Sequence, residues 1–330
     1  MPPTISVIIP VKDGGQLFQQ CLRAVAASAL KPQEVIVVDD GSTDGSRTWA
    51  AAAGARVVTT PRPASGPALA RNLGAQHATG DVLFFCDADV AIRPETLGRI
   101  QTAFAADPGL AALFGSYDDA PGDPGFVSQY KNLLHHYVHQ HGAEAASTFW
   151  SGCGAIRREL FLDHGGFSSR YALPSIEDIE LGAALTLAGQ RIRLDKGLQV
   201  KHLKRWTLAS LLQSDIWARA VPWTRLILRQ GRMLNDLNLQ TSSRLSVGLV
   251  FLGLGTLAAG WFWPPAWAAA VVAAAALLAL NRDVYAFFQR KRGWAFMLGA
   301  ILLHWLYYAY SGLAFGLGLA LHLAEAGRPR

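Results

Sequence analysis

The sequence predicts an α/β domain with a parallel sheet between two layers of helices, followed by a helical region in a membrane. Two observations predict this organisation. In the N-terminal part, short apolar runs rich in β-branched residues alternate with segments of helical spacing, as in strand–helix–strand units. In the C-terminal part, Leu245–Leu280 and Gly293–Ala324 contain no Asp, Glu, Lys or Arg, as expected of helices surrounded by lipid.

The apolar runs are the predicted strands, and the segments between them are the predicted helices. We expect strands at Ile5–Pro10, Glu34–Val38, Ala55–Thr59, Val82–Cys86 and Ala111–Tyr117, and helices at Gln16–Leu30, Ser46–Ala53, Pro67–Thr79 and Phe126–Gln140. Phe149–Ile156 is predicted as a strand interrupted by a loop of small residues, and Ser175 as the N-cap of a later helix. Ligands of such sheets bind beyond the carboxyl ends of the strands.

Two pairs of carboxylates stand at predicted strand ends. Asp39 and Asp40 follow the second strand, and Asp87 and Asp89 follow the fourth. Because residues i and i+2 of an extended segment point to the same side, the second pair converges. Close carboxylates repel each other unless a cation lies between them, and Mg²⁺ or Mn²⁺ takes carboxylate oxygens together with substrate phosphates. The pair therefore predicts a metal–diphosphate site, and the alternative is a solvated turn.

The composition and charge narrow the class of protein. The length of 330 residues suits one or two domains. Charged residues make up 16% of the chain, against a typical fraction of roughly a quarter. The net charge is +6, and its basic residues gather between Arg191 and Arg244 and at Arg290–Arg292, beside the apolar stretches. This placement favours anionic lipid headgroups as a partner and gives no support to nucleic-acid binding.

Cysteine usage and the N-terminal residues point to the cytosolic side. Cys21, Cys86 and Cys153 are far apart in the sequence, so neither a disulfide framework nor a zinc site is predicted. Met1–Lys12 has no basic segment before an apolar core, so no cleaved signal peptide is expected.

Two clusters of polar residues have alternative interpretations. Four histidines lie on one predicted helix: His135, His136, His139 and His141. They suit either a metal cluster or a solvated or interfacial helix face. Glu177 and Asp178 open another predicted helix, where they are either catalytic carboxylates or charges that cap the helix.

Taken together, six segments resemble the inverting glycosyltransferases of family two, which have the GT-A fold, a Rossmann-like mixed sheet. The matching segments are Ser6–Pro10, Val37–Asp44, Ala70–Ala75, Gly80–Asp89, Gly165–Phe167 and Glu177–Leu181. They occur in the family's order, at its usual spacings, and cover roughly residues 4 to 205.

The resemblance implies a role for particular residues. It places the donor nucleotide-sugar against Pro10, Asp39, Asp40, Arg71 and Asp87, the Mg²⁺ or Mn²⁺ ion against Asp87, Asp89 and His202, and base catalysis at Asp178 with its neighbour Glu177. Within this set, Asp39 matches the acid that contacts the nucleotide base, and Asp89 the more direct metal ligand. His202 is equally compatible with a surface histidine beside Lys201 and Lys204.

The chemistry implied by the resemblance suits these residue types. A nucleotide-sugar leaves as a nucleoside diphosphate, whose negative charge needs a cation. A carboxylate must take the proton of the attacking acceptor hydroxyl, and we expect backbone N–H groups to hold Asp178 ionised. Processive relatives carry Gln-x-x-Arg-Trp after the base; here the nearest stretch is Gln213–Trp217, so the motif is absent and transfer of one sugar is expected.

Three regions follow from the sequence. Residues 1–205 form the predicted catalytic domain, residues 206–244 amphipathic interfacial helices, and residues 245–330 a transmembrane region of two or three helices, at about 245–263, 266–280 and 294–323. The interfacial segment Trp206–Leu234 mixes apolar residues with Arg219, Arg225, Arg229 and Arg232. An ordinary amphipathic helix packed on the catalytic domain is the alternative.

The basic flanks set the predicted orientation. Arg244 and the Arg290–Arg292 loop belong inside and the uncharged Phe262–Pro265 turn outside. The protein is then a multi-pass protein of the inner, cytoplasmic membrane with its catalytic domain in the cytoplasm. Three spans leave Arg328–Arg330 outside, whereas two spans with an interfacial tail avoid this.

The predicted function is inverting transfer of a sugar from a UDP- or GDP-linked donor to a lipid or lipid-linked acceptor. One alternative is a membrane-anchored transferase with a soluble or polysaccharide acceptor, which lipid-independent activity would reveal. A sugar nucleotidyltransferase is disfavoured because Lys12–Gly15 is a poor glycine-rich loop. An inactive scaffold is disfavoured because the acids at 39, 87, 89 and 178 are all present.

Overall fold

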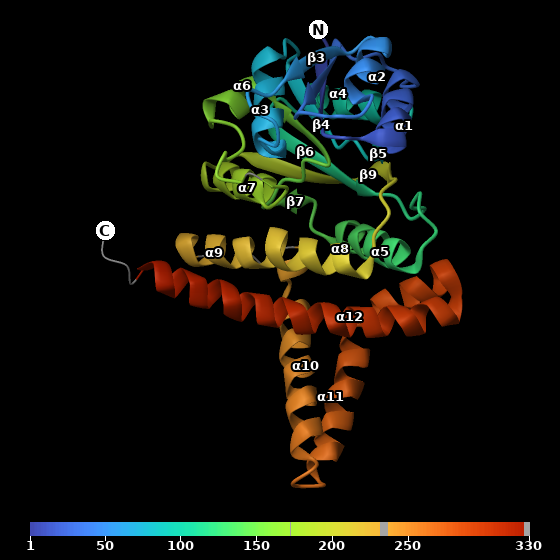
Figure 1. Ribbon diagram of the computed structural model, residues 1–330, viewed down its shortest axis with the longest axis vertical. Coiled ribbons are helices and arrows are strands. Elements are labelled where there is room, and N and C mark those ends of the chain that lie inside the picture. The colour runs from blue at the N-terminus through green and yellow to red at the C-terminus, as the bar shows by residue number, and fades with distance from the viewer. Residues whose placement is uncertain (172, 232–236, 327–330) are drawn as a thin grey trace. The chain divides into compact units, whose positions relative to one another are not determined.

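A computed structural model describes residues 1–171, 173–231 and 237–326 and divides the chain into two compact units (Figure 1). The N-terminal unit is Met1–Trp206 and the C-terminal unit begins at Thr207. Arg232 and the Arg328–Arg330 tail, both named above, lie outside the described residues.

The N-terminal unit is built on a nine-stranded mixed sheet. Its strand order is β3-β2-β1-β4-β8-β6-β9-β5, and β7 pairs with β9. The strands are β1 Ile5–Val11, β2 Glu34–Asp39, β3 Arg56–Thr59, β4 Val82–Cys86, β5 Val90–Ala91, β6 Leu110–Tyr117, β7 Ala145–Ala146, β8 Cys153–Arg157 and β9 Arg191–His202. The first four strands are parallel neighbours, and β8 runs antiparallel to both β4 and β6. The expected GT-A mixed sheet is therefore confirmed.

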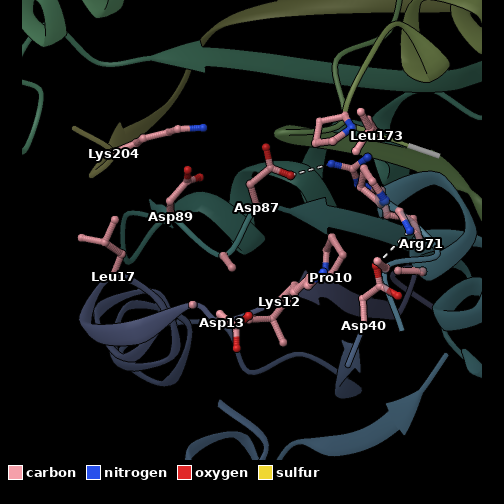
Figure 2. A pocket seen from close by; sticks show the side chains of 18 residues that line it. Pro10, Lys12, Asp13, Leu17, Asp40, Arg71, Asp87, Asp89, Leu173 and Lys204 are labelled. Atoms are coloured by element: carbon pink, nitrogen blue, oxygen red, sulfur yellow. Dashed lines mark hydrogen bonds and ion pairs between the residues drawn. The ribbon is translucent and has the colours of Figure 1, made fainter. Parts of the chain in front are cut away.

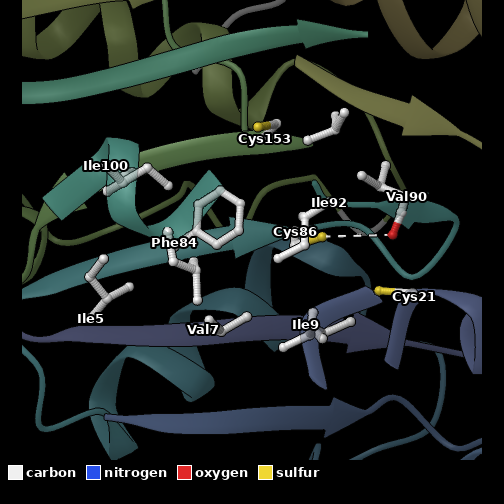
Figure 3. Packing of buried hydrophobic residues seen from close by; sticks show 14 of the residues in the cluster. Ile5, Val7, Ile9, Cys21, Phe84, Cys86, Val90, Ile92, Ile100 and Cys153 are labelled. Atoms are coloured by element: carbon white, nitrogen blue, oxygen red, sulfur yellow. Dashed lines mark hydrogen bonds between the residues drawn. The ribbon is translucent and has the colours of Figure 1, made fainter. Parts of the chain in front are cut away.

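The strands form where the sequence has contiguous apolar residues because both sheet faces are covered. All five residues of β4 are buried, and Figure 3 shows its Phe84 and Cys86 packed beside Val7 and Ile9 of β1. Such buried side chains each stabilise the fold by about 1.5–3 kcal/mol. The core therefore holds the ends of β1 and β4 in a fixed relation, which matters for the residues that follow them.

The helices of this unit follow the predicted alternation with shifted ends. They are α1 Gly15–Ala26, α2 Ser46–Ala52, α3 Pro67–His77, α4 Thr96–Ala106, α5 Phe126–His141, α6 Arg158–Asp163 and α7 Glu177–Leu187. The prediction that the first helix extends to Leu30 was wrong, because the N–H of Ala29 donates to the carbonyl of Pro94 instead of to a helical carbonyl. The strand predicted from Phe149 is confined to β8, which starts at Cys153.

Two local predictions around α5 and α7 were also wrong. The N-cap of α7 is Ile176, and the N–H of Ser175 donates to the carboxylate of Glu177. On α5, His136 and His139 are buried, and each Nδ1 lies within 2.9 Å of a carbonyl of β6. They pack α5 onto the sheet and so belong to no solvated face. Among the described residues, no group of three or more His, Cys, Asp or Glu side chains could hold a metal ion.

The C-terminal unit is helical. It comprises α8 Leu208–Gln213, the π-helix η1 Ser214–Ala220, α9 Val221–Gln230, the short 3₁₀ helix η2 Leu237–Leu239, α10 Thr241–Ala259, α11 Ala266–Leu280 and α12 Arg282–Ala326. Length and composition alone qualify α10 and α12 to cross a membrane, and α11 is a shorter apolar helix. The predicted loop Arg290–Arg292 is instead helical, and a break at Gly293, where φ is 84°, separates it from the rest of α12.

Candidate active site

A cavity of about 480 Å³ opens at the carboxyl ends of the parallel strands (Figure 2). Pro10 at the end of β1 and Asp40 after β2 lie on one side of it, and Asp87 and Asp89 after β4 lie on another. The strand register brings them together, since Val11 pairs with Asp39 and Ile8 with Phe85. The sheet thus gathers carboxylates that are far apart in the sequence, as the positions of the strand ends predicted.

Arg71 of α3 links the aspartates after β4 to the start of α7. Its guanidinium forms ion pairs with Asp87 at 2.6 Å and with Glu177 at 2.9 Å, and the residue is only 5% exposed. Burial disfavours its charge, but attraction from the two carboxylates outweighs this and raises the pKa of Arg71. Arg71 therefore remains a cation and holds together two acidic residues that are 90 residues apart. Arg71 and Asp87 line the cavity, whereas Glu177 and Asp178 are not among the described residues that line it.

A close approach of α3 to the sheet places Arg71. A Cβ at Gly74 would lie 2.5 Å from Cγ2 of Ile8 and 3.1 Å from Cγ2 of Val38. Only glycine lets the helix pack this closely on β1 and β2, and Arg71 stands one turn earlier on the same helix.

Asp178, next to Glu177, is held by the loop before β8. The backbone N–H and hydroxyl of Ser151 donate to its carboxylate at 2.9 and 3.0 Å. Burial and repulsion from Glu177 nevertheless raise the pKa of Asp178 to about 6, against the opposing effects of Ser151 and Arg71. The expected backbone N–H group of Ser151 does favour the ionised form, but desolvation is the larger effect, so the pKa of Asp178 lies above its ordinary value. A carboxylate with a pKa near 6 is well suited to accept a proton near neutral pH.

Glu177→Gln is expected to shift the acid limb of the pH–rate profile to lower pH. Activity that needs ionised Asp178 rises as pH increases through its pKa, near 6 in the native protein. Removing the negative charge of Glu177 lowers that pKa. The measurement is the pH dependence of kcat between pH 4.5 and about 8. Glu180→Gln, on the same helix turn and paired with Arg170, is the control that should leave the limb in place.

The approach of α7 to this loop depends on Gly182. A Cβ there would lie 2.2 Å from the backbone nitrogen of Phe149 and 2.4 Å from the carbonyl carbon of Thr148. Gly182→Ala should therefore push the helix away and destabilise the unit by about 1–3 kcal/mol, with loss of activity as Asp178 leaves Ser151. Thermal unfolding and kcat measure both effects. Gly98→Ala, in a helix with nothing within 4 Å of the added Cβ, should be neutral or slightly stabilising.

Asp89 lies beside His202 at the edge of the cavity. Nε2 of His202 is 3.8 Å from Oδ2 of Asp89, and the imidazole stacks on the ring of Tyr117 at 4.1 Å between centroids. Burial opposes ionisation of Asp89, but His202 and Lys204 outweigh it and lower its pKa. The carboxylates of Asp87 and Asp89 are 32% and 28% exposed. These partly open oxygen donors fit a divalent cation such as Mg²⁺ or Mn²⁺.

The two aspartates at the end of β2, Asp39 and Asp40, have separate surroundings. Asp39 is fully buried, pairs with Arg47 at 2.6 Å and accepts the N–H of Ser42. Asp40 accepts the N–H groups of Ser65 and Gly66, which shapes the turn into α3. Among the described residues that line the cavity, Asp40 takes part and Asp39 does not.

Sequence reasoning missed several residues of the site. Lys12, Asp13 and Lys204 line the cavity, and Ser151 orients Asp178. The loop of small residues that contains Ser151 is predicted from the sequence, but its partner Asp178 lies 27 residues away. Lys204 could have been found as a basic residue just after the strand that carries His202.

Comparison with known proteins finds similar glycosyltransferases. Residues 6–165 match the family model "Glycosyl transferase family 2". An uncharacterised glycosyltransferase of Escherichia coli, YibD, is 31% identical over 106 residues, 31% of each chain. The glycosyltransferase AglE of Haloferax volcanii is 34% identical over 29% of this chain and 34% of its own. The match thus spans about a third of these relatives. An uncharacterised protein of Mycobacterium tuberculosis is 27% identical over 83% of this chain and 86% of its own.

The solved structures show the same fold. A mannosyltransferase from Pyrobaculum calidifontis, in complex with GDP-Man and Mn²⁺, aligns with a TM-score of 0.59 and 23% identity, over 95% of this chain and 87% of its own. Glucosyl-3-phosphoglycerate synthase from Mycobacterium tuberculosis, with Mn²⁺ and UDP-glucose, aligns with a TM-score of 0.50 and 20% identity, over 69% and 79%. Residues 6–165 of the chain are thus similar to glycosyltransferase family 2, and the chain has the GT-A fold.

Proposed function

We propose that the protein is an inverting glycosyltransferase that moves one sugar from a UDP- or GDP-linked donor to a lipid or lipid-linked acceptor at the cytoplasmic membrane face. The observation that carries the proposal is the ion-paired guanidinium of Arg71, which joins Asp87 to Glu177. Arg71 lines the cavity together with Asp87 and Asp89, and it thereby connects carboxylates suited to a metal–diphosphate with the segment that carries Asp178, a carboxylate suited to proton transfer.

The donor half of the site uses the groups at the strand ends. We assign metal binding to the carboxylates of Asp87 and Asp89, with Mg²⁺ or Mn²⁺ as the cation and His202 beside Asp89 as a neighbour of the ion. Substrate phosphates would supply further ligands, because no group of three His, Cys, Asp or Glu side chains in the described part of the chain could hold a metal by itself. When bound, the cation supplies charge that stabilises the departing nucleoside diphosphate. Lys12 and Lys204 also line the cavity and attract the same phosphates. We further assign Pro10, Asp39 and Asp40 to the nucleotide side. The bound Mn²⁺ and nucleotide-sugars of the Pyrobaculum and Mycobacterium proteins support this half of the proposal.

The acceptor half of the site centres on Asp178. Its carboxylate takes the proton of the acceptor hydroxyl as that oxygen attacks the anomeric carbon from the face opposite the diphosphate. Ser151 orients the carboxylate, and Arg71 and Glu177 set its charge balance. A single displacement of this kind inverts the configuration at the anomeric carbon and forms no covalent sugar–enzyme intermediate.

The C-terminal unit supports a membrane acceptor. Leu245–Leu280 carries no charged residue, and α10 is long and apolar enough to cross a membrane. Large apolar side chains of this unit are exposed, including Trp261 at 80% and Phe262 at 93%. Lipid is the solvent in which such a surface is stable. An acceptor that lies in the same membrane would then be concentrated beside the enzyme.

The proposal is tested by nucleotide release from a panel of UDP- and GDP-sugars by the full-length protein purified in detergent. Reactions contain Mn²⁺, Mg²⁺ or EDTA, with and without total membrane lipid, and Asp89→Asn serves as the inactive control. Release that requires both a divalent cation and lipid, with one preferred donor, is expected. Release that lipid does not change would assign a soluble acceptor, and absence of release with every donor would contradict the enzyme assignment.

A further inference from the structure

The helices α10 and α11 form a hairpin whose surface suits hydrocarbon. They run antiparallel in Figure 1, and the indole N–H of Trp267 donates to the carbonyl of Leu257 across the turn. Their lengths, 19 and 15 residues, correspond to about 28 and 22 Å, close to the roughly 30 Å hydrocarbon thickness of a bilayer. The turn carries the exposed aromatic residues Trp261, Phe262 and Trp263.

The base of this hairpin is tied to the middle of α12. The hydroxyl of Tyr308 donates to Oδ1 of Asn281 at 2.7 Å, and the amide of Asn281 donates to Ser246 at 3.0 Å. Asn281 directly follows α11, and Ser246 lies in the second turn of α10. Ser246 is fully buried and Tyr308 nearly so. This hydrogen-bond chain fixes one point of α12 at the open end of the hairpin.

From that point α12 follows η1 and α9. The hydroxyl of Tyr310 donates to Asp215 of η1 at 2.7 Å. Further along, a Cβ on Gly318 would lie 2.7 Å from Cβ of Thr224. Near its end, Glu325 forms ion pairs with Arg225 and, at 3.8 Å, with Arg229. Residue numbers increase in the same direction along both partners of these contacts. The two helices therefore run side by side in the same direction, as Figure 1 shows.

The charged residues of η1 and α9 decide the orientation of this helix pair relative to a bilayer. If α12 crossed the hydrocarbon, η1 and α9 would have to cross beside it, and Asp215, which accepts a hydrogen bond from Tyr310 near the middle of residues 294–326, would lie deep in the membrane together with Arg219 one turn later. Each such charged residue costs about 2.5–3.5 kcal/mol at the centre of a spanning helix. In the membrane plane Arg219, Arg225 and Arg229 lie at headgroup level, where anionic lipid attracts them. The in-plane arrangement is therefore strongly favoured.

The exposed side of α12 suits the same arrangement. Leu298, Leu302, Leu306 and Leu313 are exposed. They recur at intervals of four or seven residues and form one apolar stripe. The opposite side, with Ala300, Tyr308 and Ala314, is buried against the rest of the unit. The break at Gly293, which has a φ of 84°, lets the chain change direction between the basic segment Arg282–Arg292 and this stripe.

We propose that the C-terminal unit meets an anionic bilayer in two ways. The α10–α11 hairpin enters the hydrocarbon and returns to the side it came from, and residues 294–326 lie in the membrane surface beside α9. The C-terminal end of α12 is then on the same side of the membrane as α9, and the chain crosses twice at most. This inference rests on the membrane attachment in the proposed function and adds its topology, so α12 is a surface helix despite its length.

The test is labelling of single introduced cysteines with a membrane-impermeant maleimide in the full-length protein. The native cysteines are buried, so the unsubstituted chain is the unlabelled control. Gln213→Cys and Ala324→Cys, both at exposed positions, are expected to react from the same side of sealed vesicles. Labelling from opposite sides would show a third crossing and overturn the inference.

A depth measurement gives an independent result. A fluorophore on Leu298→Cys, Leu306→Cys or Leu317→Cys, in vesicles of phosphatidylcholine and phosphatidylglycerol, is quenched by lipids brominated at different acyl positions. An in-plane helix predicts one shallow depth for all three positions. A spanning helix would spread them over about 28 Å and would contradict the inference.

Neither measurement uses donor or acceptor. The proposed membrane topology can therefore be contradicted while the proposed sugar transfer is supported, and sugar transfer can be contradicted while the topology is supported. Recovery of the full-length protein in the soluble fraction of a lysate would overturn the membrane inference outright. It would leave transfer to a soluble acceptor open to the nucleotide-release assay. Loss of membrane binding at high salt alone would also contradict the inference, because an inserted hairpin holds the protein by apolar contact that salt does not screen.

Discussion

Asp178→Asn is expected to lower kcat for sugar transfer by about 10²–10⁴-fold, the usual contribution of a positioned general base. The amide has nearly the same shape, and its oxygen can still accept the hydrogen bonds that Ser151 donates at 2.9 and 3.0 Å. It cannot accept the acceptor's proton. The measurement is steady-state nucleotide release with saturating donor and lipid.

The donor site supplies the control for this variant. Binding of the nucleoside diphosphate, measured by calorimetry in the presence of Mn²⁺, should stay within a few-fold of the native value because Asp178 lies on the acceptor side. Ser151→Ala, which keeps the backbone donor, should reduce activity less and raise the pKa of Asp178. Full activity of Asp178→Asn would rule out Asp178 as the base.

Arg71→Met is expected to have the largest effect on stability. The substitution leaves two carboxylates, Asp87 and Glu177, without their cation, and Glu177 is 3% exposed. Removing one partner of a buried ion pair typically costs 3–5 kcal/mol. Chemical unfolding of the detergent-purified protein measures this change, and activity should fall with it because Asp87 and Glu177 are no longer held together.

Two further variants distinguish the effect of losing the buried ion pairs of Arg71 from the effect of losing an ion pair at the surface. Arg99→Met removes a pair with Asp195 in which the arginine side chain is 47% exposed, and a change of no more than about 1 kcal/mol is expected. Adding Glu177→Gln and Asp87→Asn to Arg71→Met should recover part of the stability but none of the activity. Equal losses for Arg71→Met and Arg99→Met would contradict the central role of Arg71.

The sheet could be predicted from the sequence because its strands are buried on both faces. The residues of β4, for example, form a contiguous apolar run. A run of that length followed by a pair of aspartates can be recognised as a buried strand from the sequence alone. Element ends were less predictable. The first helix was predicted to continue to Leu30, but α1 ends at Ala26 and the N–H of Ala29 donates to the carbonyl of Pro94. No local sequence pattern indicates this contact between distant segments.

Most of the residues of the site could be predicted from the sequence, but the ion pairs and hydrogen bonds between them could not. Asp87, Asp89 and Asp178 follow motif positions, whereas the bridge through Arg71 joins segments separated by 106 residues. The raised pKa of Asp178 depends on burial and on Glu177, and burial of a particular carboxylate has no local sequence signal. The burial of His136 and His139 on α5 had no local signal, because their partners are backbone carbonyls of the distant strand β6.

In the C-terminal unit, composition alone leaves the number of spans open. The uncharged stretch at residues 294–323 is the third of the two or three spans that the sequence predicts. Its direction depends on three contacts with distant residues, at Tyr308, Tyr310 and Glu325. Hydropathy measures how apolar a helix is and contains no information about which helix it follows.

The most direct test of the central claim is the anomeric configuration of the product, determined by NMR with the preferred donor and its lipid acceptor. A site in which Asp178 removes the acceptor's proton while Asp87 and Asp89 hold the leaving diphosphate acts by one displacement. The product is therefore expected to have the anomeric configuration opposite to that of the donor. Retention of the donor's configuration would contradict it, because it would require a second displacement or attack from the face of the leaving group.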